Sequence, residues 1–100
     1  VRMRFAQWRS VIDADLTGAF LCSRAVLAPM LARGYGRIVM IGSLAGLAGN
    51  VGQANYAAAK AGLVGLARSL ARETARDGIT VNVVAPGYIE TDLLAALPEA

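Results

Sequence analysis

Histidine is absent from this chain of 100 residues, and cysteine occurs once. Without histidine, the chain cannot supply a Ser-His-Asp triad or a Cys-His pair, and a structural zinc site lacks its ligands. Cys22 has no internal disulfide partner, which suits a reducing compartment and predicts a cytoplasmic protein. The apolar residues around Cys22 predict a small buried side chain rather than a nucleophile.

Aromatic residues, charges and long apolar runs are also scarce. Aromatic residues make up 6% and charged residues 17%, and the net charge of +3 is spread along the chain, so a nucleic-acid partner is not favoured. No apolar run approaches the roughly 18 residues of a membrane span. Asp13 and Asp15 interrupt the stretch after the basic N-terminus, so we expect neither a membrane partner nor a signal peptide.

Apolar periodicity divides the chain into alternating helices and short β runs. The predicted elements are a helix over Trp8–Ala32 with a loosened last turn at Pro29, a strand over Arg37–Ile41, a loop over 42–53, a helix over Ala54–Asp77, a strand over Ile79–Val84 and the start of a helix from Glu90. A helix between two short strands indicates a βαβ unit with parallel strands. Parallel sheets are typically covered on both faces. The fold class is therefore α/β, a partial doubly wound, Rossmann-like sheet.

Lysine is as rare as cysteine, because Lys60 is the only one and every other basic residue is arginine. Its spacing from Tyr56 places both side chains on one face of the predicted helix. An ammonium in that place favours the ionised phenol, which makes Tyr56 a candidate acid/base. The alternative is a solvated helix face that carries both residues by chance.

Other polar residues converge on the same edge of the predicted sheet. The helix between the strands runs antiparallel to them, so its first turns lie over the carboxyl ends of the strands, where open α/β folds bind ligands. Ser43 follows the first strand, and Ala85–Ile89 follows the second. A hydroxyl, a phenol and an ammonium would then surround one crevice.

These motifs resemble the short-chain dehydrogenase/reductase family. The resemblance is carried by Ile41-Gly42-Ser43, the Tyr56–Lys60 pair and Asn82–Gly87, while Gly52–Gly62 and Pro86–Asp92 resemble its 3-oxoacyl-[acyl-carrier-protein] reductase branch. The similarity covers essentially the whole chain. It implies hydride transfer from NADP(H), with NAD(H) as the alternative, to the ketone of a 3-oxoacyl thioester, as in fatty-acid synthesis.

The resemblance assigns a role to each matching position. Tyr56 would protonate the substrate carbonyl, Lys60 would hold the nicotinamide ribose and favour ionised Tyr56, and Ser43 would orient the carbonyl. The implied cofactor contacts are Tyr56, Lys60, Pro86, Gly87, Ile89 and Thr91. The resemblance also implies a small-molecule or acyl-carrier-bound substrate and a homo-oligomer, a homotetramer, built through helices 8–32 and 54–77.

Two features depart from the family pattern. Asp15 stands where the family usually has an asparagine that holds a water of the proton relay toward the lysine. A carboxylate there would favour protonated Lys60 but disfavour ionised Tyr56, so Asp15 is a candidate catalytic residue that could reduce activity. The family's glycine-rich phosphate loop and its last strand do not occur in this sequence. Residues 1–100 are therefore predicted to be the catalytic middle-to-late portion of one Rossmann-like domain, inactive alone.

Three other interpretations stay open. Sugar-nucleotide epimerases and dehydratases use the same Tyr-Lys pair on the same fold. Ser43 and Lys60 could form a hydrolase that needs no histidine. The two long helices could also serve only in oligomerisation, without catalysis.

Overall fold

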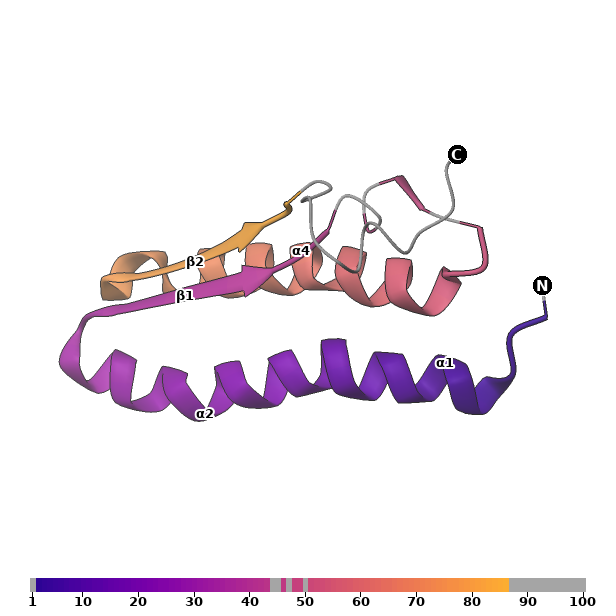
Figure 1. Ribbon diagram of the computed structural model, residues 1–100. Helices are drawn as coiled ribbons and strands as arrows, with labels where there is room; N and C mark the ends of the chain where they lie inside the picture. The colour runs from indigo at the N-terminus through magenta and orange to yellow at the C-terminus, as the bar shows by residue number, and fades with distance from the viewer. Residues whose placement is uncertain (1, 44–45, 47, 50, 87–100) are drawn as a thin grey trace.

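The computed structural model describes residues 2–43, 46, 48–49 and 51–86. Its elements, in chain order, are the α-helix α1 (Phe5–Val11), the π-helix η1 (Ile12–Thr17), the α-helix α2 (Gly18–Arg33), the strand β1 (Gly36–Ile41), the α-helix α4 (Ala54–Thr74), the 3₁₀-helix η2 (Ala75–Asp77) and the strand β2 (Ile79–Val84) (Figure 1). The predicted order of helix, strand, helix and strand is confirmed. The predicted helix after Glu90 lies outside the described residues, as does part of the predicted loop.

One continuous helical segment, α1–η1–α2, stands where the sequence predicts a single α-helix, and it runs beneath the two strands in Figure 1. At its start the backbone N–H of Arg4 donates to Gln7 Oε1 at 3.0 Å. The helix continues through Pro29 and ends at Gly34, which adopts the left-handed conformation with φ 66°. The backbone N–H of Tyr35 then donates to the Met30 carbonyl at 3.2 Å. This bond satisfies one of the free carbonyls at the helix end.

The two strands are parallel, as predicted, and pair from Gly36 opposite Ile79 to Ile41 opposite Val84. The N–H of Gly42 donates to the Val84 carbonyl at 2.7 Å, so the pairing extends one residue past β1. The carboxyl ends of both strands therefore lie together at one edge of the sheet.

Only one face of the sheet is covered by the described residues. Buried or half-buried residues alternate with exposed ones along both strands. On the open face Val39, Ile41 and Val84 are 60%, 58% and 50% exposed. The expectation of cover on both faces is not met in this part of the chain, because α2 and α4 both pack against the same face.

The core lies between this covered face and the helices. Its buried members are Met40, Leu63, Ala67, Ile79 and Val81. Leu16 of η1 packs at its margin, against α4. A Cβ atom on Gly62 of α4 would lie 2.7 Å from Leu16 Cδ2, so η1 and α4 are in close contact. This contact sets the position of Asp15, the residue before Leu16, relative to α4.

Helix α2 is apolar on all sides, which explains one wrong prediction. Cys22 is exposed rather than buried. Large apolar residues of the same helix, Phe20, Leu21 and Val26, are exposed as well. Apolar spacing could not show which side of such a helix faces the core, because no polar stripe marks the other side. Despite this composition, no helix in the described ranges is long and apolar enough to cross a membrane.

Candidate active site

Tyr56 and Lys60 lie in the first two turns of α4, and both are half-buried. The Lys60 Nζ atom lies 5.5 Å from the centroid of the Tyr56 ring. At this distance the ammonium is attracted to the face of the ring. The structure therefore brings together the two side chains that the spacing of four residues predicts to share a helix face.

Lys60 also bridges α4 to the sheet. Its Nζ donates a hydrogen bond to the carbonyl oxygen of Ile41, the last residue of β1, at 3.2 Å. A lysine ammonium carries three N–H donors, and this bond uses one of them. The bond holds the ammonium at the carboxyl edge of the sheet, where the strand ends.

Asp15 faces the same space as Lys60. Both residues line an open cavity of about 390 Å³ between η1, α2, β1 and α4, together with Cys22, Ser23 and Ile41. Asp15 lies on the π-helical turn η1. Such turns are rare; they occur mostly inside α-helices and are frequent at functional sites. The structure thus places Asp15, the residue that departs from the family pattern, in the cavity that Lys60 lines.

Ser43 follows β1 at this edge of the sheet and is half-buried. The N–H of Gly46 donates to the Ser43 carbonyl at 3.0 Å. A Cβ atom on Gly46 would lie 2.7 Å from both Lys60 Cβ and the Ala61 nitrogen. The chain that leaves β1 therefore lies against the second turn of α4, which keeps Ser43 in the same region as Lys60.

Pro86 follows β2 and is half-buried. Because the strands are parallel, it lies at the same sheet edge as Ser43. Gly87, Ile89 and Thr91, the remaining predicted cofactor contacts, lie outside the described residues.

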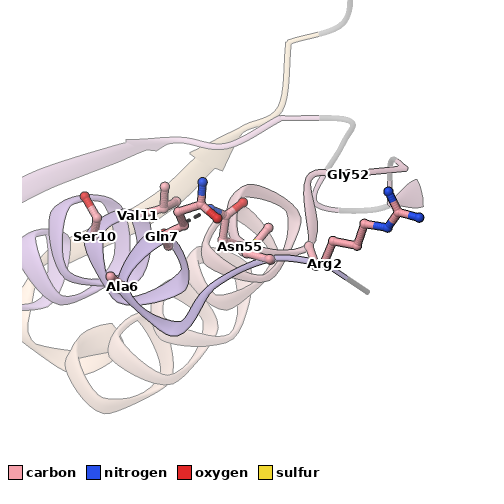
Figure 2. A pocket seen from close by; sticks show the side chains of 9 residues that line it. Arg2, Ala6, Gln7, Ser10, Val11, Gly52 and Asn55 are labelled. Carbon is pink, nitrogen blue, oxygen red and sulfur yellow. Dashed lines mark hydrogen bonds between the residues drawn. The ribbon is translucent and has the colours of Figure 1, made fainter.

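Sequence reasoning missed Asn55. Its Oδ1 accepts a hydrogen bond from the backbone N–H of Tyr56 at 2.7 Å. Its Nδ2 donates to the Gln7 carbonyl at 3.1 Å (Figure 2). Asparagine is favoured where helices begin, because its side chain can accept from free backbone N–H groups. The sequence signal that could have identified Asn55 is an asparagine next to the tyrosine at the start of a predicted helix.

A second cavity, of about 750 Å³, lies where α1 meets the start of α4. Gln7, Ser10 and Asn55 line it with apolar residues of both helices (Figure 2). Within the described residues it shares no lining residue with the cavity of Asp15 and Lys60. The residue pair Gln7–Asn55 thus borders a space separate from the candidate site.

The sequence model of the family described as short chain dehydrogenase matches residues 2–100. This chain belongs to the short chain dehydrogenase family. It is 54% identical over 99 residues to the 3-oxoacyl-[acyl-carrier-protein] reductase FabG of Escherichia coli, with 99% of this chain and 41% of that protein covered. The family resemblance drawn from the motifs is confirmed.

Two further relatives are also named 3-oxoacyl-[acyl-carrier-protein] reductases. The FabG protein of Pseudomonas aeruginosa is 52% identical over 100 residues, which cover 100% of this chain and 40% of the relative. The 3-oxoacyl-[acyl-carrier-protein] reductase of Synechocystis sp. is 54% identical over 93 residues, covering 93% of this chain and 38% of the relative. The chain therefore spans about two fifths of the length of these relatives.

Proposed function

We propose that a protein containing these residues is an oxidoreductase that reduces the ketone of a 3-oxoacyl thioester carried on acyl carrier protein, with NADPH as the hydride source. The observation that carries the proposal is the Tyr56–Lys60 pair, with the ammonium 5.5 Å from the ring centroid and bound to the Ile41 carbonyl at 3.2 Å. The names of the relatives support the substrate class.

The donors at this edge of the sheet fit one half of a nicotinamide cofactor. Lys60 uses one N–H on Ile41, and an ammonium has two more that suit the ribose hydroxyls. The glycines between β1 and α4, Gly46, Gly49 and Gly52, do not have the spacing of the family's phosphate-binding loop, so the sequence holds no cradle for the pyrophosphate. When bound, the nicotinamide supplies the hydride.

The side chains of this chain would donate the proton and hydrogen-bond the carbonyl oxygen of the substrate. Tyr56 donates its phenolic proton to that oxygen while the carbonyl carbon gains the hydride, so the C=O double bond becomes the C–OH of a 3-hydroxyacyl thioester. The hydroxyl of Ser43 donates a hydrogen bond to the same oxygen and orients it. The ammonium of Lys60 stabilises the phenolate that remains on Tyr56.

A Tyr56→Phe substitution in the complete protein tests the proposal. The variant loses the proton donor but keeps the ring, so we expect kcat to fall at least about a thousandfold while the NADPH dissociation constant stays within about twofold. Tyr35→Phe is the matched control, because Tyr35 is 57% exposed, and it should retain parental activity. Activity of Tyr56→Phe within about tenfold of the parent, roughly 1.4 kcal/mol in the barrier, would contradict the assignment. Turnover of sugar nucleotides alone would favour the epimerase alternative.

We also propose that the protein assembles as a homo-oligomer through α1–α2 and α4, over 8–32 and 54–77. The support is the group of exposed apolar side chains on the first two helices, Phe5, Phe20, Leu21, Val26 and Leu31. Exposed apolar patches on helices mark interaction surfaces. Light scattering of the complete protein should give the mass of a tetramer, and a monomer at micromolar concentration would contradict this proposal.

A further inference from the structure

Asn55 joins two helices at the point where the candidate catalytic tyrosine is held. Tyr56 is the third residue of α4, and the first backbone N–H groups of a helix have no partner within the helix. The Tyr56 N–H is satisfied by Asn55 Oδ1 at 2.7 Å. The side chain of Asn55 therefore closes the turn that carries Tyr56.

The other end of the same amide reaches α1. Asn55 Nδ2 donates to the Gln7 carbonyl at 3.1 Å, a link between residues 48 positions apart. Gln7 is itself fixed, because its Oε1 accepts from the Arg4 N–H at 3.0 Å. In Figure 2 the Asn55 side chain lies between the first turn of α4 and the ribbon of α1. One planar amide thus connects a fixed turn of α1 to the backbone of Tyr56.

We propose that Asn55 is a positioning residue: its amide holds the first turn of α4 against α1 and so fixes Tyr56 relative to the cavity of Asp15 and Lys60. Helix α1 continues directly into η1, which carries Asp15. The link through Asn55 therefore restrains the backbone of Tyr56 relative to η1 and the cavity that η1 lines. A displacement of about 1 Å at a reacting group can cost a hundredfold in rate. The catalytic consequence rests on the proposed function.

Asn55→Asp in the complete protein isolates the link to α1. The aspartate keeps an oxygen for the Tyr56 N–H but places an acceptor against the Gln7 carbonyl, so that bond is lost. A negative charge near the N-terminus of α4 is favourable, so the helix itself should remain folded. We expect kcat, calculated per NADPH-binding site, to fall about tenfold or more. The NADPH dissociation constant should stay within about twofold of the parental value. A variant that was merely less folded would lose NADPH-binding sites and activity together.

Ser69→Ala is the matched control, because it removes a polar group from an exposed position of the same helix; it should keep the parental rate. Asn55→Asp with kcat within about twofold of the parent would overturn the inference while leaving the proposed function intact.

Amide hydrogen exchange tests the link without any assay of activity. In Asn55→Asp we expect residues 54–58 to exchange at least about tenfold faster than in the parent, while residues 63–74 exchange as before. Unchanged exchange over 54–58 would overturn the inference. If the parent protein reduces no 3-oxoacyl thioester, the proposed function fails, and exchange still decides the role of Asn55.

Discussion

At the scale of single residues, Lys60 is held between the Ile41 carbonyl and the ring of Tyr56. Arginine keeps the charge but replaces a compact ammonium with a planar fork, which fits ribose hydroxyls poorly. We expect Lys60→Arg in the complete protein to lower both NADPH affinity and kcat by about tenfold or more. Arg68→Lys, an exposed exchange on the same helix, is the control. Parental kinetics of Lys60→Arg would mean that only a distant charge is needed.

Asp15 allows the opposite kind of test, in which activity should not fall. Its carboxylate lines the same cavity as Lys60, and asparagine keeps nearly the same shape while it removes the negative charge. We expect Asp15→Asn to leave kcat/KM unchanged or to raise it up to about tenfold. Asp13→Asn is the control, because Asp13 is exposed and pairs with Arg9 at 3.8 Å; steady-state assays should show no effect. A marked loss in Asp15→Asn would show that the carboxylate is required.

The sequence alone could predict which residues of the candidate site lie together only where those residues are close in the sequence. Tyr56 and Lys60 are four residues apart on a helix, so the sequence alone places them together. Asp15 was identified through the family resemblance, since no local pattern connects it to Lys60. The link from Asn55 to Gln7 spans 48 positions. It depends on how α1 packs on α4, which no local pattern contains.

At the scale of elements, the close approach of the β1–α4 connection to α4 depends on Gly46. A Cβ atom there would lie 2.7 Å from the Ala61 nitrogen and 2.8 Å from the Lys60 carbonyl carbon. Because backbone atoms cannot move aside cheaply, we expect Gly46→Ala to cost about 1–3 kcal/mol of unfolding free energy and to lower activity by displacing the chain after Ser43. Denaturant unfolding and steady-state assays of the complete protein measure both effects.

Gly65→Ala is the matched control for that prediction. Gly65 lies inside α4 and has no neighbour within 4 Å of the added Cβ among the described atoms. Alanine favours a helix interior over glycine by about 0.5–1 kcal/mol, so the unfolding free energy should rise. Equal losses in the two variants would show that the described packing of Gly46 is not what limits stability.

The sequence predicted some features of the helices and strands correctly and others not at all. The bounds of β2 were predicted correctly, because Gly78 takes the left-handed conformation with φ 75° and marks the turn before it. The π-helix η1 was not predicted, since apolar spacing gives an average repeat and cannot show one widened turn. The side of α2 that faces the core could not be predicted either, because apolar residues lie all round the helix. For the same reason the exposure of Cys22 was not predicted.

At the scale of the whole molecule, the open sheet face governs how these 100 residues behave alone. Val39, Ile41 and Val84 are exposed there, and parallel strands with uncovered faces and edges favour association. The sequence also has no phosphate loop. We expect the isolated chain to aggregate and to bind no NADPH in isothermal titration, whereas the complete protein binds it. One-to-one binding at micromolar concentration by the isolated chain would contradict this prediction.

The π-helical turn η1 holds one residue more than the α-helical turn in whose place it stands. Each residue of an α-helix turns the chain by about 100°. Deleting one residue within η1 would restore an ordinary α-helix with the same helical content, invisible to circular dichroism. Because each residue of the wider π-turn rotates the chain by less than an α-helical residue does, the rotation of α1 relative to α2 would change little, and the Gln7 carbonyl would stay near Asn55. Single-residue deletions in this stretch should therefore be better tolerated than deletions elsewhere in α1 or α2, and their effect should fall on the cavity that Asp15 lines.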